Sequence, residues 1–242
     1  MKDLHSHLLY RIDDGSRSIE ESIFLLKRME NSGVKELILT PHYVENSKFN
    51  CNNYNKEIIF NKLSEKAKEE NISIKLYLGN EAYITDNLVD LIEKGEIRTL
   101  NNSKYLLFEF PLRQKVNGSF DIIHKIITNG YIPVLAHPER YITFQEHPEL
   151  IAEYLRAGVL LQGNFTSLFN KYGKKSQKTL KYFLKNKMIT FLGSDTHRIV
   201  EFDEKKLRKK LLRITKDKEY VEDLLNNNFD KVINNQDIGI VG

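Results

Sequence analysis

The sequence predicts an α/β fold built on a parallel sheet. Seven short apolar runs alternate with amphipathic stretches of helical spacing. Most of the runs are continuous rather than alternating, as expected for parallel strands that are buried on both faces. Closure of seven strands into a (β/α)7 barrel leaves no exposed edge and is the simplest arrangement. A doubly wound open sheet is the alternative fold.

The elements follow in order along the chain. The expected strands are Lys2–His5, Glu36–Thr40, Ser73–Gly79, Tyr105–Phe110, Ile132–Ala136, Gly158–Gly163 and Met188–Gly193. The first helix begins at Ser18, carries Glu20 and Glu21 in its first turn, and is closed by Gly33. Further helices are expected at Tyr54–Glu70, Thr85–Lys94, Ser119–Asn129, Glu146–Ala157, Lys175–Asn186, Asp203–Lys216 and Glu219–Asn227.

The composition is typical of one globular domain spanning residues 1–242. Hydrophobic residues make up 40% of the chain, and no apolar run approaches the roughly 18 residues that a membrane span needs. The first residues, Met1 to His7, lack the basic-then-apolar pattern of a signal peptide. We therefore expect a cytoplasmic protein without a membrane span.

Charge and cysteine content exclude some classes of function. Cys51 is the only cysteine, and position 57 is a glutamate, whereas a cysteine-dependent phosphatase needs an arginine six positions after its nucleophile. The net charge is +4, with lysines concentrated at 171–187 and 205–216. These lysines indicate either solvated helix faces or attraction of an acidic or phosphorylated partner. Aromatic residues are not interleaved with these lysines in a way that suggests base stacking, which argues against nucleic-acid binding.

Six of the seven expected strands end with ionisable side chains. In βα barrels the catalytic groups lie at the carboxyl ends of the strands. The candidates are His5, His7, Asp14, His42, Glu81, Glu109, His137, Asp195 and His197. The sixth run offers only Gln162 and Asn164 there. His124 and His147 fall on predicted helices and are interpreted as structural.

The spacing and type of these residues predict a metal centre. His5 and His7, like Asp195 and His197, are two positions apart and face the same way on an extended chain. Glu109 lies among apolar residues, where an unpaired carboxylate is costly and a cation would compensate. Imidazole and carboxylate without thiolate suit Mn²⁺, Fe²⁺, Zn²⁺ or Mg²⁺. Nine ligands imply two or three ions, and paired ions suit displacement at phosphorus. The prediction is therefore a hydrolase of phosphate esters.

The motifs resemble those of the PHP (polymerase and histidinol phosphatase) superfamily. The matching residues are His5, His7, Thr40–His42, Glu81, His137 and Ser194–His197. This resemblance implies a distorted seven-stranded TIM-like βα barrel with a trinuclear site.

A closer resemblance covers nearly the whole chain. It rests on Asp3–His7, Asp13–Ser16, Glu20–Ser22, Gly79–Tyr83, Phe108–Phe110, Ala136–Tyr141 and Ser194–His197. These motifs resemble the bacterial manganese-dependent protein-tyrosine phosphatases, which act on tyrosine kinases that control capsule and exopolysaccharide synthesis. The resemblance implies bound manganese and a phosphotyrosine-containing partner protein. Nothing in the sequence marks an interface, so a monomer or weak oligomer is the simplest expectation.

The resemblance also implies roles for individual residues. His5, His7, Glu81 and Asp195 would hold a first ion; Glu81, Glu109 and His137 a second; Asp14, His42 and His197 a third. Arg140 would engage the phosphate through its planar guanidinium fork. Family members often carry a further arginine after the last metal histidine, but residues 199–203 contain none. Phosphate binding or substrate preference is therefore expected to differ here.

The expected mechanism is attack of a metal-bridging hydroxide on phosphorus, in line with the departing phenolate. Three alternatives share parts of the same pattern. A small-molecule phosphatase such as histidinol phosphatase would use the same ligands, and so would a metal-dependent nuclease. A non-catalytic module that binds phosphopeptides is the third alternative.

Overall fold

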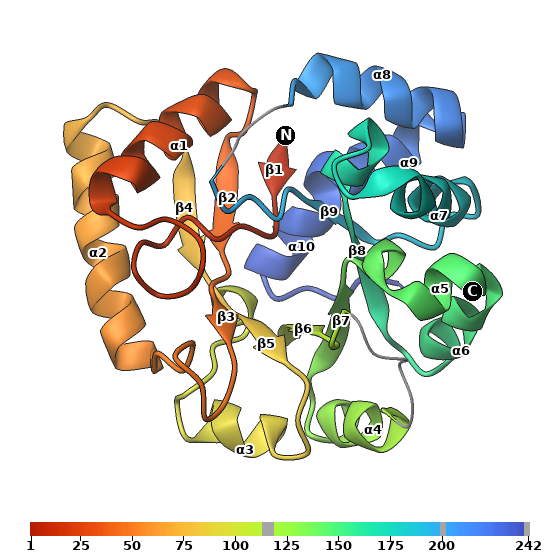
Figure 1. Ribbon diagram of the computed structural model, residues 1–242, viewed down its shortest axis with the longest axis horizontal. Helices are drawn as coiled ribbons and strands as arrows, with labels where there is room; N and C mark the ends of the chain where they lie inside the picture. The colour runs from red at the N-terminus through yellow and green to blue at the C-terminus, as the bar shows by residue number, and fades with distance from the viewer. Residues whose placement is uncertain (113–118, 199–201, 240–242) are drawn as a thin grey trace.

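The protein is an α/β fold in which helices surround a curled parallel sheet. The computed structural model describes residues 1–112, 119–198 and 202–239. Figure 1 shows the strands at the centre of the molecule and the helices around them. Within these residues the strands are β1 (Lys2–Asp3), β2 (Glu36–Leu39), β3 (His42–Tyr43), β4 (Lys75–Leu78), β5 (Glu81–Tyr83), β6 (Tyr105–Glu109), β7 (Ile132–Ala136), β8 (Leu160–Asn164) and β9 (Phe191–Gly193).

Each of the seven expected runs contains a strand, and two short strands were not expected. β3 follows β2 after a break at Pro41, and β5 follows β4 after Asn80. Pro41 has no backbone N–H to donate to a strand ladder, which accounts for the first break. The strands form two parallel sheets, in the orders β1-β2-β4 and β3-β5-β6-β7-β8-β9.

Backbone hydrogen bonds join the two sheets and bring the first strand beside the last. The N–H of Thr40 donates to Ser6 O at 2.8 Å and extends the pairing of β1 with β2 within the first sheet. The N–H of Asp195 donates to His5 O at 2.9 Å and joins the segment after β9, in the second sheet, to the segment after β1. Ser6 and Thr196 form an isolated parallel bridge. The strand order thus follows the chain order around a curled wall. A doubly wound sheet would reverse its strand order partway, so the described strands do not support that alternative.

The two faces of the sheet pack against different partners. Leu107, Val134 and Phe191 belong to an apolar cluster on the inner face of the curled sheet. The next residue along β6, Phe108, instead belongs to the larger cluster that includes residues of α1 and α7. Side chains alternate across a strand, so this division follows from the pleat. The continuous apolar runs in the sequence reflect burial on both faces.

The helices largely match the expected ranges. Within the described residues the α-helices are α1 (Ile19–Asn31), α2 (Asn53–Glu69), α3 (Leu88–Glu93), α4 (Phe120–Thr128), α5 (Ile142–Glu146), α6 (Ile151–Arg156), α7 (Gly173–Lys185), α8 (Glu204–Thr215), α9 (Lys218–Glu222) and α10 (Asn228–Ile233). Ser18 caps α1 as predicted, because its side chain accepts a hydrogen bond from the N–H of Glu21. None of these helices is both long and apolar enough to cross a membrane.

Two helix predictions were wrong in detail. The expected helix over Glu146–Ala157 is broken at Pro148, which begins a 3-10 turn between α5 and α6. Proline disfavours helical geometry in the residue before it, and so α5 ends at Glu146. The helix expected to end at Asn227 passes through a π-helical turn, Asp223–Asn227, into α10.

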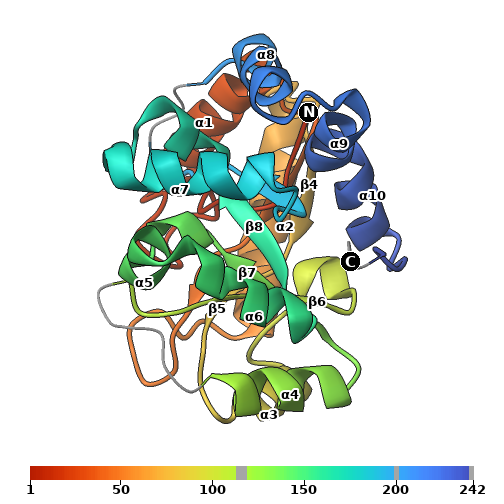
Figure 2. The ribbon, with the colours of Figure 1, turned by 90° about the vertical axis from the view of Figure 1, so that its right-hand side faces the viewer.

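Helix α10 closes the amino ends of the strands. Phe229 and Val232 of α10 join the inner apolar cluster beside Leu4 and Tyr105. The ammonium of Lys2, at the start of β1, pairs with Asp230. Figure 2 shows α9 and α10 together on one side of the molecule. The opposite, carboxyl ends of the strands remain available for a site.

Candidate metal centre

The predicted metal ligands meet at the carboxyl ends of the strands. A pocket of about 280 Å³ is lined there by seven of the nine, together with Arg140. The other two, His5 and His7, are fully buried at its base. Further 3-10 turns lie in the connections: Leu100–Asn102 after α3, Pro138–Arg140 after β7, and Phe165–Phe169 after β8. The strand-end reasoning therefore selected residues that lie close together in the structure.

Glu81 stands at the centre of the cluster. Its Oε2 lies 3.0 Å from His42 Nδ1, 3.2 Å from His5 Nε2 and 3.3 Å from His7 Nε2. Its Oε1 lies 2.8 Å from His137 Nε2. Although three imidazole nitrogens surround Oε2, this buried oxygen accepts no hydrogen bond. A buried carboxylate oxygen without a donor is costly, and a cation at that point would satisfy it.

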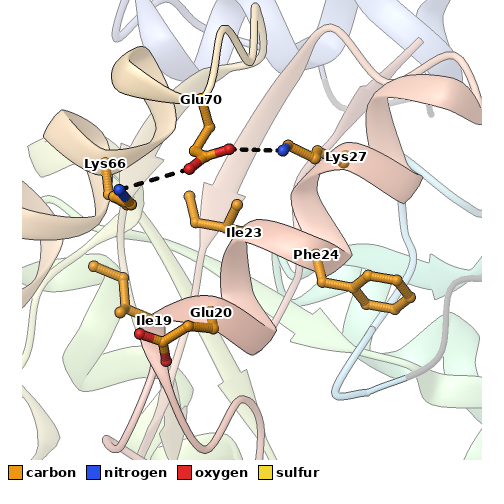
Figure 3. Close-up of a pocket in the computed structure, with 7 residues that line it drawn as sticks. All are labelled: Ile19, Glu20, Ile23, Phe24, Lys27, Lys66 and Glu70. Atoms are coloured by element: carbon orange, nitrogen blue, oxygen red, sulfur yellow. Dashed lines mark hydrogen bonds and ion pairs between the residues drawn. The ribbon is translucent and has the colours of Figure 1, made fainter.

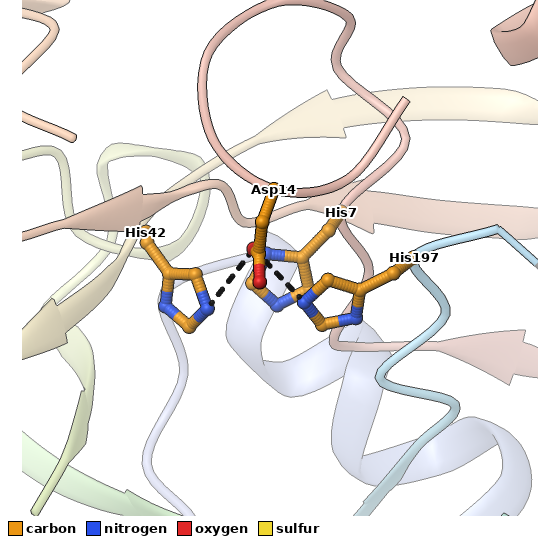
Figure 4. Close-up of side chains that lie close together, drawn as sticks. All are labelled: His7, Asp14, His42 and His197. Atoms are coloured by element: carbon orange, nitrogen blue, oxygen red, sulfur yellow. Dashed lines mark ion pairs between the residues drawn. The ribbon is translucent and has the colours of Figure 1, made fainter. Parts of the chain in front are cut away.

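Seven of the nine candidate ligands form three overlapping groups. In each group the ligand atoms lie within 4.8 Å of one another. The groups are His5, His7 and Glu81; His42, Glu81 and Glu109; and His7, Asp14, His42 and His197. Figure 4 shows the last group, in which Asp14 Oδ1 lies 3.3 Å from His197 Nε2 and 3.7 Å from His42 Nε2. Imidazole and carboxylate donors at this spacing fit a cluster of divalent ions.

Asp195 divides its two oxygens between different partners. Its Oδ1 faces three imidazoles, 3.4 Å from His7 Nε2, 3.5 Å from His197 Nδ1 and 3.7 Å from His5 Nε2. Its Oδ2 accepts hydrogen bonds from Arg140 at 2.6 Å, Asn164 at 2.8 Å and Tyr172 at 3.2 Å. One oxygen is thus directed into the cluster while the other is fixed by neighbours, as in supported metal ligands.

The electrostatics of the centre favour ionised carboxylates. Burial opposes the charge of Glu81, but the His5 and His42 rings outweigh burial and hold the pKa of Glu81 well below its usual range. Burial and the nearby His7 oppose protonation of His42, yet Glu81 and Glu109 raise the pKa of His42 to about 10. Positive charge is therefore strongly attracted to this cluster, and a metal ion can supply it in place of protons.

Two candidate ligands leave their strands in an unusual backbone conformation. His137, after β7, has φ +37°, and Asp195, after β9, has φ +50°. Positive φ is uncommon for residues other than glycine and is found preferentially at functional sites. At each of these two positions, the change in backbone direction turns the side chain from the end of the sheet into the cluster.

Several supporting residues were not predicted as site residues. Asp13 Oδ2 lies 2.7 Å from His7 Nδ1 and accepts a hydrogen bond from the backbone N–H of His42. Buried Glu139 accepts hydrogen bonds from the N–H of Asn164 and the hydroxyl of Ser167. The paired aspartates before Gly15 and the carboxylate beside Arg140 were the available signals for these residues.

Arg140 lies at the edge of the pocket, held from two sides. Besides its hydrogen bond to Asp195, its guanidinium carbon lies 4.3 Å from the centre of the Tyr172 ring. Arg198, by contrast, donates to the carbonyl oxygens of Asp14 and Gly15 rather than into the pocket. Of the segment expected to lack a second family arginine, residues 199–201 lie outside the described residues. His124 and His147 are exposed and lie outside the cluster.

A second hollow, between α1 and α2, lacks these properties. It is lined by Ile19, Glu20, Ile23, Phe24, Lys27, Lys66 and Glu70 (Figure 3). Glu70 pairs with Lys27 at 2.8 Å and with Lys66 at 3.6 Å, so its charge is already balanced. This hollow contains no imidazole, and we do not assign it a role.

The fold and the donor set define a class of protein. A parallel sheet curled within helices, with a buried cluster of imidazoles and carboxylates at the carboxyl ends of its strands, defines an α/β protein with a candidate site for divalent metal ions.

The chain belongs to the CpsB/CapC family of capsular polysaccharide synthesis, whose family model matches residues 1–234. CapC of Staphylococcus aureus is 33% identical over 225 residues, which cover 93% of this chain and 87% of that protein. The tyrosine-protein phosphatase CpsB of Streptococcus pneumoniae is 30% identical over 204 residues, covering 82% of this chain and 84% of that protein. The family resemblance inferred from the motifs is therefore confirmed.

Solved structures support the same relationship. A chain from the crystal structures of YwqE from Bacillus subtilis and CpsB from Streptococcus pneumoniae, described as unique metal-dependent tyrosine phosphatases, matches with a TM-score of 0.91. It is 26% identical, and the match covers 99% of this chain and 96% of that one. Histidinol phosphate phosphatase from Lactococcus lactis matches with a TM-score of 0.54 at 16% identity, over 89% of this chain and 91% of that one. The latter likeness concerns the fold alone.

Proposed function

We propose that this chain is a metal-dependent protein-tyrosine phosphatase that hydrolyses phosphotyrosine. The observation that carries the proposal is a single pocket in which candidate metal ligands, the half-buried Arg140 and an apolar wall meet. Membership of the CpsB/CapC family, with relatives named tyrosine-protein phosphatases, supports the same reaction and a role in capsular or exopolysaccharide synthesis.

The nine candidate ligands are proposed to hold three divalent ions, with manganese as the resident metal. The first would be bound by His5, His7, Glu81 and Asp195; the second by Glu81, Glu109 and His137; the third by Asp14, His42 and His197. Two of the three groups contain Glu81, which supports a carboxylate that would be shared between two ions. His42 lies between two of the proposed sites, because its Nδ1 is 3.0 Å from Glu81 and its Nε2 faces Asp14.

Bound divalent ions supply Lewis acidity, which lowers the pKa of water and balances negative charge on the transferring phosphoryl group. Arg140 is proposed to bind the phosphate oxygens through its planar fork. Its present partner Asp195 and the Tyr172 ring hold the guanidinium at the pocket edge. The phenolate of tyrosine, with a pKa near 10, leaves more readily than an alkoxide, so a strong general acid is not required.

The apolar wall supports an aromatic phosphate ester as substrate. Tyr83, Phe110, Pro111 and Leu112 line the pocket beside the candidate ligands. A phenyl ring can pack on such side chains, while a polar alcohol would gain little from them. This wall favours phosphotyrosine over a small polar phosphate ester.

The remaining assignments concern setting and architecture. We infer a cytoplasmic enzyme whose partner is a phosphotyrosine-containing protein, a bacterial tyrosine kinase, and which works as a monomer or weak oligomer. Residues 1–242 are taken as one metallophosphoesterase domain. The two sheets are interpreted as one distorted seven-stranded barrel wall, with β3 continuing β2 and β5 continuing β4. The bridge between Ser6 and Thr196 supports this closure.

Phosphate release tests the proposal directly. Metal-stripped protein would be assayed on a phosphotyrosine peptide with and without Mn²⁺, beside a matched phosphoserine peptide and histidinol phosphate. Release from the phosphotyrosine peptide, only with added metal, is the expected result. Faster turnover of histidinol phosphate would move the function to a small-molecule phosphatase. Tight binding of the phosphotyrosine peptide without turnover by metal-loaded protein would indicate a binding module.

A further inference from the structure

Two amide side chains on β8 connect two candidate metal ligands, one after β1 and the other after β9. Gln162 Oε1 lies 2.7 Å from His5 Nδ1, and Gln162 Nε2 donates to Asn164 Oδ1 at 3.0 Å. Asn164 Nδ2 in turn donates to Asp195 Oδ2 at 2.8 Å. Both amides are fully buried. They form one continuous chain of hydrogen bonds from Asp195 to His5.

We propose that Gln162 and Asn164 are positioning residues that fix His5 in the Nδ1–H tautomer and so present its Nε2 lone pair to a metal ion. The proposal rests on the metal centre proposed above, but not on the identity of the substrate. It gives a function to the end of the sixth expected strand, Gly158–Gly163, which offers no ionisable group.

The direction of the chain is set at its Asp195 end. An ionised carboxylate can only accept hydrogen bonds, and Oδ2 already accepts from Arg140. Asn164 must therefore present its amide nitrogen to Asp195, which leaves its oxygen for Gln162. Gln162 must then present its nitrogen to Asn164 and its oxygen to His5. A neutral His5 ring can satisfy that oxygen only by carrying its proton on Nδ1.

The backbone around the amides is built for this close approach. A Cβ atom at Gly193 would lie 2.6 Å from His5 Cβ and 2.9 Å from Gln162 Nε2, so a side chain there would push the two apart. The backbone N–H of Asn164 is held by Glu139 Oε1 at 3.0 Å. Position and orientation of the amides are thus both constrained.

His7 provides an internal comparison. Its Nδ1 faces the carboxylate of Asp13 at 2.7 Å, which directs its Nε2 into the cluster in the usual manner of a carboxylate-supported ligand. His5 has no carboxylate at the same position. The amide pair performs the same orientation without adding a negative charge, and it couples His5 to Asp195 and Arg140.

The test uses the full chain loaded with diamagnetic Zn²⁺ and labelled with ¹⁵N-histidine. Long-range proton–nitrogen correlation spectra identify which nitrogen of His5 carries the proton. We expect a single, slowly exchanging Nδ1–H in the unchanged protein. In Asn164→Leu, which alters no group touching His5, that proton should lose its protection because the Gln162 amide is free to turn.

Zinc affinity, measured with a competing chelator, is the second readout. Gln162→Met and Asn164→Leu should each weaken binding roughly 10–100-fold, as loss of outer-shell partners does in other metal sites. The matched control is Gln177→Met, because Gln177, on α7, donates to Leu168 O and lies outside the hydrogen-bond chain from Asp195 to His5. This variant should retain both the His5 signal and the affinity.

Two results would overturn the proposal. One is a proton on His5 Nε2 in the unchanged protein, which needs no variant to fold. The other is an Asn164→Leu protein that is folded by circular dichroism yet keeps the His5 signal and full zinc affinity. Failure to release phosphate from phosphotyrosine would instead refute the proposed substrate and leave these readouts unaffected.

Discussion

The inner face of the curled sheet has two ends with opposite chemistry. On β6, Tyr105 and Leu107 lie in the closed apolar cluster, whereas Glu109, two residues further on, lines the pocket. On β9, Phe191 belongs to the apolar cluster, and Asp195 lies beyond the end of the strand in the metal centre. The same strand faces therefore carry packing at their amino ends and ligands at their carboxyl ends.

This difference separates what holds the fold from what performs the reaction. The amino end is closed by α10 and buries apolar side chains, which is favourable in water. The carboxyl end buries carboxylates and imidazoles, which is costly until their charges are compensated. Substitutions at the two ends should consequently fail in different ways.

The largest effect is expected from removing a ligand. His5→Ala or Asp195→Ala should lower phosphate release from a phosphotyrosine peptide by at least about a thousandfold, because charge on the transferring group loses its stabilisation. The thermal midpoint of the metal-free protein should change little, since the apolar end is untouched. His124→Ala, at an exposed histidine outside the cluster, is the control. A folded His5→Ala protein with near-normal turnover would refute the assignment.

The next effect compares two neighbours on the inner face of β6. Leu107→Ala should cost about 2–5 kcal/mol in free energy of unfolding, because it leaves a cavity in the apolar cluster. Its phosphate release per folded molecule should be preserved. Glu109→Gln should show the reverse: weak activity with nearly unchanged stability. Urea unfolding of metal-stripped protein measures the first quantity, free of stabilisation by bound metal. Equal losses of stability at both positions would remove the distinction between the two ends.

Arg140 should have a smaller effect on turnover than a ligand. Arg140→Ala is expected to lower kcat/KM about a hundredfold while metal content is retained, because a charge-assisted contact to phosphate is lost. Arg140→Lys should recover only part of the rate, since lysine keeps the charge but lacks the fork. Metal analysis of both variants distinguishes phosphate binding from positioning of Asp195. A loss of metal would show that Arg140 acts by holding Asp195.

The smallest effect is expected at Tyr172. Tyr172→Phe keeps the ring beneath Arg140 but removes the hydroxyl that donates to Asp195, and should lower kcat/KM about two- to tenfold. Tyr172→Ala, which also removes the stacked ring, should be worse. Tyr131→Phe, beside the amino end of β7, is the matched control. Identical rates for Tyr172→Phe and Tyr172→Ala would mean that the stacking is unimportant.

Much of this arrangement could be predicted from the sequence, because functional side chains in this type of fold lie at the carboxyl ends of the strands. The apolar runs located the strands, and the carboxyl-end rule collected nine residues that the structure brings to one region. Supporting residues were harder to find. Gln162 and Asn164 carry no charge, and Tyr172 lies between a 3-10 turn and α7, where no periodic pattern points to it.

The errors have local physical causes. β3 and β5 are two and three residues long, too short to leave a pattern, and they depend on pairing with neighbours rather than on propensity. Helix α10 follows an asparagine-rich stretch that resembles a helix stop, but burial of Phe229 and Val232 against the strands continues the helix. Tertiary packing decided each of these cases.

The parallel bridge between Ser6 and Thr196 has a consequence for how the protein matures. The ligands proposed for the first metal ion include His5, after the first strand, and Asp195, after the last strand. This proposed site therefore cannot be complete until both segments have been synthesised and have paired. Ions that meet the nascent polypeptide encounter only isolated imidazoles and carboxylates. Metal binding should therefore follow closure of the sheet. Full metal occupancy would then report that the segments after the first and last strands have paired.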